Sequence, residues 1–185
     1  LGQILILYIL ALKIGLLRSD IEKNKLSEKL KDLKELPKLV EQTLLTDNKI
    51  QNVSTTFNDA KGSMFLGRGF SYPIALEGAL KLKELSYVHA EGYPAAEMKH
   101  GPIALIDEEM PVFVIATKDS SYEKIVSNIQ EVKARKGKII AIVTQGDTEV
   151  KKIADHYIEI PKCNELLVPL LATVPLQLLS YHIAL

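Results

Sequence analysis

The sequence predicts an α/β protein, in which a central parallel sheet is covered by helices on both faces. From residue 63 onward, short apolar runs rich in β-branched residues alternate with longer segments of helical periodicity. Glycine and proline residues separate these segments, as expected for the turns between strands and helices. With 185 residues, of which 47% are hydrophobic and 25% charged, the chain is long enough for one domain with a sizeable core.

The charge balance and the cysteine content exclude several classes of protein. Lys and Arg together number 23, as do Asp and Glu, so the formal net charge is zero and nucleic acid is not expected as a partner. The one cysteine, Cys163, has no partner for an internal disulfide, and no Cys/His cluster has the spacing of zinc ligands. We therefore expect a soluble, cytoplasmic protein without a metal site.

Residues 1–18 form the first predicted helix, which is apolar on nearly every side. A helix of this kind is expected to be buried against something larger. Its uninterrupted apolar run, residues 4–12, falls well short of the roughly 20 residues that span a bilayer. The segment also lacks the basic start and the cleavage site of a signal peptide, so no membrane association is predicted.

Residues 19–60 are rich in charge and are predicted to form a helical linker. Apolar residues recur there at three- and four-residue intervals, as in an amphipathic helix: Leu26, Leu30, Leu33, Leu36, Leu39 and Val40. Pro37 is expected to bend or divide this helix, because proline cannot donate a backbone hydrogen bond inside it. The polar stretch 46–61 is predicted to be a weakly structured connection with room for one helical turn.

Four strands are predicted in the rest of the chain, at residues 63–67, 111–117, 138–144 and 156–160. Most of them are short and almost continuously apolar, which is typical of strands in a parallel sheet that is buried on both faces.

Helices are predicted between these strands, at residues 74–90, 95–99, 122–136 and 149–154, and a last helix from about residue 165 to the end. Pro73 suits the first turn of its helix, and Gly137 is a natural C-cap. The last helix is long and apolar, but its two prolines and its polar residues would be costly in lipid. We expect it to be a buried helix of a soluble protein.

The loop after the first of these strands is one candidate binding site, because ligands of open parallel sheets bind at the carboxyl ends of the strands. Gly67, Arg68 and Gly69 begin this loop, the glycines allow close backbone approach, and the next helix would offer free N–H groups to an anion. A strand-to-helix turn also needs glycine for purely geometric reasons. The endings of a P-loop and of a dinucleotide-binding motif are absent, so no cofactor is predicted.

The helix after this loop carries a stripe of charge. At 100° per residue, Glu77, Lys81 and Glu84 fall within an arc of about 60° that has apolar residues on both sides. The stripe fits two interpretations: a surface salt bridge, or charges on a buried face that supply a base and an anion contact.

His100 is the third candidate, at the end of a short helix just before Gly101 and Pro102. By itself this position also suits a surface histidine that the helix dipole favours in its charged form. Cys163 has no neighbouring base and is predicted to be a small apolar packing residue.

These motifs resemble those of a known family. FLGRGFSYPIALEGALKLKELSYVHAEGYPAAEMKHGPIALID, residues 65–107, closely resembles the second sugar-isomerase (SIS) domain of the glutamine–fructose-6-phosphate aminotransferases, and VPLQLLSYHIAL resembles that family's last long helix. The resemblance is strong over residues 61–185 and looser over 1–60. It implies a three-layer αβα SIS domain with a central parallel sheet, preceded by helical segments.

The resemblance also implies an activity and site residues. The family makes glucosamine 6-phosphate from fructose 6-phosphate with ammonia from glutamine, a step of hexosamine biosynthesis towards UDP-N-acetylglucosamine. By matching motif, Glu84 would move a proton between C1 and C2 of the sugar imine, and Lys81 would contact the open-chain sugar. His100 would promote ring opening in the neighbouring subunit's site, which implies a homodimer. Glu77 would be a partner of Lys81, and Gly67, Arg68 and Gly69 would support substrate binding.

The family pattern predicts three regions: 1–18 as the terminal helix of a preceding SIS domain, 19–60 as a linker, and 61–185 as the second SIS domain. The family's glutaminase domain, first SIS domain and C-terminal tail have no counterpart in these residues, and both ends of the chain look cut. We therefore expect that this chain alone does not make glucosamine 6-phosphate.

Two other functions remain open: a phosphosugar isomerase or deglycase of related fold, and a phosphosugar-sensing SIS module. The charged stripe favours an enzyme, because a sensor gains little from a desolvated carboxylate.

Overall fold

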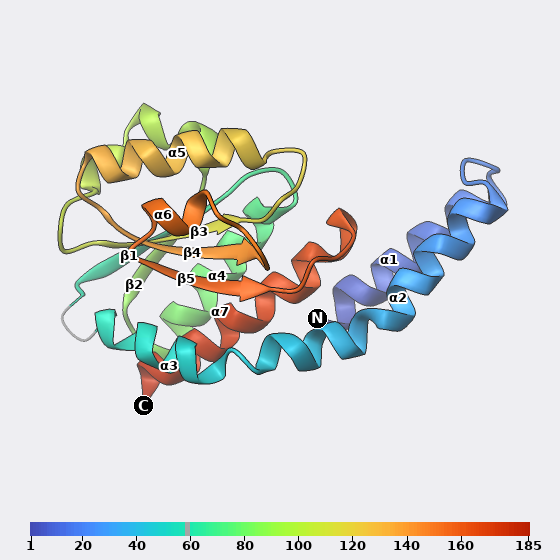
Figure 1. The fold of residues 1–185 in the computed structure, drawn as a ribbon, viewed down its shortest axis with the longest axis horizontal. Coiled ribbons are helices and arrows are strands. Elements are labelled where there is room, and N and C mark those ends of the chain that lie inside the picture. The colour runs from blue at the N-terminus through green and yellow to red at the C-terminus, as the bar shows by residue number, and fades with distance from the viewer. Residues whose placement is uncertain (58–59) are drawn as a thin grey trace.

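A computed structural model describes residues 1–57 and 60–185 and confirms the α/β prediction. Within these residues, parallel strands form a single five-stranded sheet in the order β2-β1-β3-β4-β5 (Figure 1). The strands are β1 (Gly62–Gly67), β2 (His89–Pro94), β3 (Pro111–Ala116), β4 (Lys138–Thr144) and β5 (His156–Ile160).

Helices cover both faces of this sheet, as predicted. α3 (Asp47–Ser54), α4 (Ser71–Ser86) and α7 (Val168–Ala184) lie on one face, and α5 (Tyr122–Ala134) and α6 (Val150–Ile153) lie on the other (Figure 1). Successive strand residues point to opposite faces. Thus Phe113 joins the α4/α7 core and stacks on Phe65 at 4.8 Å between ring centroids, while Val112 and Val114 join the α5 core.

The edge strand β2 is the main departure from the sequence-based prediction. The helix predicted over 74–90 ends at Ser86, because Tyr87 takes a left-handed conformation at φ 60°. Residues 89–94 then pair with β1 along its whole length, from Gly62 opposite His89 to Gly67 opposite Pro94. Their strand conformation therefore comes from pairing with β1 and not from an apolar run of their own.

The next helix, α5, also ends differently from its prediction. It stops at Ala134, and Lys136, not Gly137, adopts the left-handed conformation, with φ 62°. Gly137 is instead needed for close packing, since a Cβ there would lie 2.6 Å from Ile106 Cγ2.

The N-terminal helices project away from the sheet (Figure 1). α1 (Gly2–Leu17) and α2 (Lys23–Leu44) form an antiparallel hairpin, in which α1 buries only Leu12 and Gly15 within this chain. α2 continues through Pro37, so the prediction that this proline could divide the helix is wrong.

The stretch 46–61 is more ordered than predicted. It contains α3 and a 3-10 turn, η1 (Thr55–Phe57), and it buries Ile50, Val53 and Phe57 in the core of the sheet domain. Residues 58 and 59 of this stretch lie outside the described residues. Apolar anchors within a polar sequence thus dock this segment.

The C-terminal helix belongs to the core. By length and composition, residues 165–184 would qualify as a membrane span, but 61% of the qualifying window is buried in this structure. η4 (Glu165–Leu167) leads into α7, which packs against α4 and α3. This is the buried helix that the sequence predicts.

Candidate active site

The β1–α4 loop is a tight turn whose glycines are needed for geometric reasons. A Cβ at Gly67 would lie 2.2 Å from the carbonyl oxygen of Ser71, and Gly69 has φ +52°. The N–H of Ser71 donates to Arg68 O at 2.9 Å, and that of Tyr72 donates to Gly69 O at 3.3 Å. These two N–H groups are therefore used within the turn, and the next residue is a proline, which has no N–H. The first three residues of α4 thus have no free N–H for an anion, and the expectation that they would offer one is wrong.

The Arg68 side chain extends from this loop to the face of the sheet that α5 covers. Its Nη1 donates to Asn128 Oδ1 at 3.1 Å. Asn128 lies within the buried stripe of α5 and is 5% exposed. The sequence analysis missed Asn128, although a polar residue between Ile125 and Ile129 on an apolar helix face was a visible signal.

On α4, Lys81 Nζ lies 2.6 Å from Glu84 Oε2. The two side chains are 29% and 50% exposed, so the stripe is not on a buried face, and the expectation of desolvated charges is wrong. α4 turns its small and branched residues towards the sheet and α7, and leaves Leu76, Leu80 and Leu85 exposed beside the charges.

The partner of Lys81 is therefore Glu84 and not the half-buried Glu77, which corrects the pairing that the resemblance implied. The hydrogen bond to Glu84 raises the pKa of Lys81 above its usual value, and the charge of Glu77 adds to this effect. Lys81 thus remains a cation at neutral pH. A carboxylate and an ammonium group lie side by side on an open surface, where both can contact a ligand.

His100 ends the 3-10 helix η2 (Ala95–His100), and Gly101 follows with φ +148°. Its Nδ1 lies 2.8 Å from Glu97 Oε2, and both side chains are exposed. When Nδ1–H donates to this carboxylate, a neutral imidazole carries its free lone pair on Nε2. His100 can then accept or deliver a proton at Nε2.

Chain topology separates His100 from the Lys81–Glu84 pair. α4 starts beyond the carboxyl end of β1 and returns to the amino end of β2, so Glu84 lies towards the amino edge of the sheet. His100 follows the carboxyl end of β2. A six-residue strand is about 20 Å long. η2 buries Ala95 and Met98 in the core on the α5 side of the sheet, whereas α4 covers the opposite face. Within one chain the structure therefore places η2, with His100, and Glu84 on opposite sides of the sheet.

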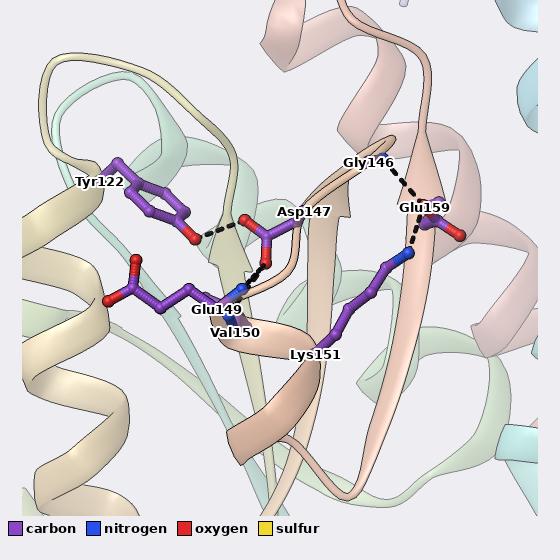
Figure 2. A network of polar contacts seen from close by, with 7 residues as sticks. All are labelled: Tyr122, Gly146, Asp147, Glu149, Val150, Lys151 and Glu159. Carbon is purple, nitrogen blue, oxygen red and sulfur yellow. Dashed lines mark hydrogen bonds and ion pairs between the residues drawn. The ribbon is translucent and has the colours of Figure 1, made fainter.

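A buried carboxylate organises the carboxyl ends of β3 and β4 (Figure 2). Asp147 is 1% exposed, and its Oδ1 accepts the N–H groups of Glu149 at 3.1 Å and Val150 at 2.9 Å. Its Oδ2 accepts the hydroxyl of Tyr122. Burial and this hydrogen bond raise the pKa of Tyr122, so the phenol stays protonated. The sequence analysis missed this network, whose two ends are 25 residues apart.

A second carboxylate, from β5, contacts the loop and the helix that follow β4. Glu159 Oε1 accepts the N–H of Gly146 at 3.1 Å and lies 2.6 Å from Lys151 Nζ (Figure 2). These contacts hold the loops after β3 and β4 and join the second of them to β5.

An open hollow of about 600 Å³ lies beside these loops, and none of the predicted site residues lines it. Its lining consists of Lys118, Asp119, Ser120, Tyr122, Glu123 and Lys124. Two lysines and two carboxylates balance in charge, so the hollow has no net preference for an anion.

Cys163 is half-buried and packs against the core, in keeping with its predicted role. Burial, together with the charge of Asp32, raises the pKa of its thiol to about 11, so it is a poor nucleophile.

His182 joins α7 to α3, with Nε2 2.7 Å from Asp47 Oδ1. In the described part of the chain, His, Cys, Asp and Glu form no group of three suited to a metal.

A five-stranded parallel sheet between helical layers makes this an α/β domain of the three-layer type. Residues 56–185 match the family model of the SIS domain, and the chain belongs to this family. The resemblance drawn from the sequence is thereby confirmed at the level of the domain.

Individual relatives of the chain indicate a narrower group of proteins than the model of the SIS domain does. The chain is 57% identical over 183 residues, or 99% of its length, to the glutamine–fructose-6-phosphate aminotransferase (isomerizing) of Bacteroides thetaiotaomicron, and 50% identical over the same length to that of Chlorobaculum tepidum. It spans 30% of each of these relatives.

Solved structures agree. The C-terminal domain of glucosamine-fructose-6-phosphate aminotransferase from Francisella tularensis superimposes with a TM-score of 0.91 at 42% identity, over 96% of this chain and 50% of that one. A tagatose-6-phosphate ketose/aldose isomerase from Escherichia coli, with a TM-score of 0.66 at 18% identity over 80% of this chain and 42% of that one, shares the fold alone.

Proposed function

We propose that the full-length protein containing this chain converts fructose 6-phosphate and glutamine to glucosamine 6-phosphate and glutamate, and that this chain supplies part of the sugar-isomerisation site. The observation that carries the proposal is the 57% identity with an aminotransferase of that name over nearly the whole chain. The reaction would place the protein in hexosamine biosynthesis towards UDP-N-acetylglucosamine, in the cytoplasm. A sugar phosphate would be its ligand.

The Lys81–Glu84 pair supports the isomerisation step. Glu84 is half-exposed, so a bound sugar imine can reach its carboxylate, which removes a proton from C1 and returns it at C2. Lys81 is held 2.6 Å from that carboxylate and stays charged, so it can stabilise negative charge that develops on a sugar oxygen. Glu77, on the same stripe, would support the charge of Lys81.

The separation of Glu84 from His100 supports a site shared between two subunits. His100 can act as the acid–base group for ring opening, but within one chain η2 and α4 lie on opposite sides of the sheet. A two-fold symmetric homodimer would bring His100 of one chain to the Glu84 of its partner. The loop of Gly67, Arg68 and Gly69 would then support the side of the site that carries His100.

The exposed helix α1 supports a packing partner outside the SIS domain. Its apolar face is largely uncovered in this chain, and the relatives are more than three times as long as the chain. In the full-length protein α1 would pack as the terminal helix of a preceding SIS domain, with residues 19–60 as the linker.

The test is an assay of glucosamine 6-phosphate formation by the full-length protein, with fructose 6-phosphate and glutamine, for wild type and Glu84→Gln. The expected result is formation by wild type and its collapse in Glu84→Gln, with sugar-phosphate binding retained. Glu108→Gln is the matched control, because Glu108 also forms an exposed ion pair, with Lys136, on another part of the surface.

A folded wild type that makes no product overturns the proposal. Interconversion of a sugar phosphate without glutamine would then indicate a phosphosugar isomerase or deglycase. Binding of a sugar phosphate without any turnover would indicate a phosphosugar sensor.

A further inference from the structure

Four polar side chains from three elements form a continuous bridge on the face of the sheet that α5 covers. Arg68 Nη1 donates to Asn128 Oδ1 at 3.1 Å, Asn128 Nδ2 donates to Glu131 Oε2 at 3.3 Å, and Lys99 Nζ lies 2.8 Å from Glu131 Oε1. We name this set, Arg68, Asn128, Glu131 and Lys99, the α5 bridge.

The centre of the α5 bridge requires an amide. Asn128 is 5% exposed, so its polar atoms must be satisfied by the protein. Arg68 can only donate and the Glu131 carboxylate can only accept, which fixes the orientation of the amide between them. An aspartate would retain the acceptor but would place a second carboxylate beside Glu131, and a leucine would satisfy neither neighbour.

The two ends of the α5 bridge, Arg68 and Lys99, lie in two segments that carry predicted site residues. Arg68 lies between the two glycines of the β1–α4 loop, and Lys99 immediately precedes His100 in η2. The strands that lead into these loops are neighbours, with Gly67 opposite Pro94. η2 also buries Ala95 and Met98 in the core that α5 covers.

The contacts differ in how far solvent can weaken them. The Lys99 side chain is 58% exposed, so its ion pair alone would contribute little to stability. Glu131 is 24% exposed, and its other oxygen is fixed by the buried amide. The buried half of the bridge therefore provides a rigid anchor, from which the exposed half restrains η2.

We propose that Asn128 and Glu131 are positioning residues, which hold the His100 turn in the geometry that ring opening requires. Neither residue contacts a substrate in this role: they act on His100 through Lys99, and on the β1–α4 loop through Arg68. The inference rests on the proposed function, and its effect would be on turnover because the restrained group is the one that transfers a proton.

The test compares three variants in the full-length protein: Lys99→Met, Glu131→Gln and Asn128→Leu. Two quantities are measured, the amide hydrogen exchange of residues 95–101 and the kcat and KM of glucosamine 6-phosphate formation. Lys152→Met is the matched control, since it removes an exposed lysine from α6, outside the α5 bridge.

We expect hydrogen exchange in residues 95–101 to become about tenfold faster in Asn128→Leu and Glu131→Gln, and about threefold faster in Lys99→Met, which removes only the exposed ion pair. We also expect kcat to fall by about tenfold with KM within about twofold, because misplacement of a catalytic group affects turnover. The double variant Lys99→Met with Glu131→Gln should lose no more activity than the more impaired of the two single variants, because both changes remove the same Lys99–Glu131 contact. Restoring a carboxylate with Glu131→Asp should recover part of kcat.

Lys99→Met keeps the test decisive if Asn128→Leu fails to fold, because Lys99 is largely exposed. Unchanged exchange and unchanged kcat in Lys99→Met and Glu131→Gln, in an active protein, would overturn the inference. If wild type makes no glucosamine 6-phosphate, the proposed function has failed on its own. Exchange then decides: faster exchange supports the restraint on the His100 turn, and unchanged exchange overturns it.

Discussion

The α5 side of the sheet and the outer face of α4 use polar residues in opposite ways. On the α5 side, Asn128 and Asp147 are almost completely buried, and both sides of each side chain have partners. On α4, Lys81 and Glu84 are partly exposed and bond to each other. A buried polar group left without a partner costs about 1–3 kcal/mol, whereas an exposed ion pair contributes about 0–1 kcal/mol. The buried polar groups therefore stabilise the fold and hold neighbouring loops in place, whereas the exposed pair on α4 is free to contact a ligand.

The largest expected effect is a loss of activity without a loss of stability. Glu84→Gln should lower the rate of glucosamine 6-phosphate formation by about 10³-fold, because it removes the proposed general base. The midpoint of chemical denaturation should hardly move, since the change in unfolding free energy stays below about 0.5 kcal/mol for an exposed pair. A large drop in stability would show that the Lys81–Glu84 pair has a structural role, and would contradict the difference proposed between the exposed pair and the buried polar groups.

The opposite effect is expected at Asp147. Asp147→Ala should lower the free energy of unfolding by about 2–3 kcal/mol, because it leaves two backbone N–H groups and the Tyr122 hydroxyl without their acceptor. Urea denaturation measures this change. Glu149→Ala, in the same loop, is the control and should change stability by less than about 0.5 kcal/mol. Equal stabilities of the two variants would argue against a structural role for the buried carboxylate.

A smaller effect is expected at Asp155, which lies between these extremes of exposure. Burial raises the pKa of this carboxyl, but hydrogen bonds from Lys133 and from the N–H of Ile139 outweigh burial and lower it below its usual value. Its contribution to stability is present above the ordinary carboxyl pKa and is lost as the pH falls through the lowered value. Asp155→Asn should therefore flatten the decline in stability below about pH 4.

The control for this pH dependence is Asp20→Asn, in the exposed turn after α1, where the carboxylate pairs with Arg18 on the surface. Its stability should stay close to that of wild type, because an exposed ion pair contributes little to stability. A curve for Asp155→Asn that keeps the wild-type slope would contradict the assigned role of Asp155.

The predictable parts of the fold are those with a local signal. β3, β4 and α7 follow from apolar runs that need no partner to be recognised. β2 could not be found in this way, because its residues become a strand only through pairing with β1. The helical wheel of α4 placed Lys81 and Glu84 together correctly, but it could not show which neighbouring leucines face the sheet and which face solvent.

The same distinction between local signals and long-range contacts applies to the prediction of the candidate site. The motif resemblance marked Glu84 and His100, but local patterns do not reveal that α4 and η2 lie on opposite sides of the sheet. Asn128 stood out as polar within an apolar stripe, yet its partner Arg68 is 60 residues away. Long-range partners of buried polar groups depend on the packing of whole elements, which local periodicity does not contain.

The most direct test of the divided site is complementation between two inactive variants of the full-length protein, Glu84→Gln and His100→Ala. In the proposed homodimer, co-expression at equal levels would give hybrid dimers in which one of the two sites combines an intact Glu84 with an intact His100 of the partner. Random pairing in a two-fold dimer predicts recovery of about a quarter of wild-type activity. No recovery in purified hybrid dimers would contradict the account and would require both groups to act from one chain.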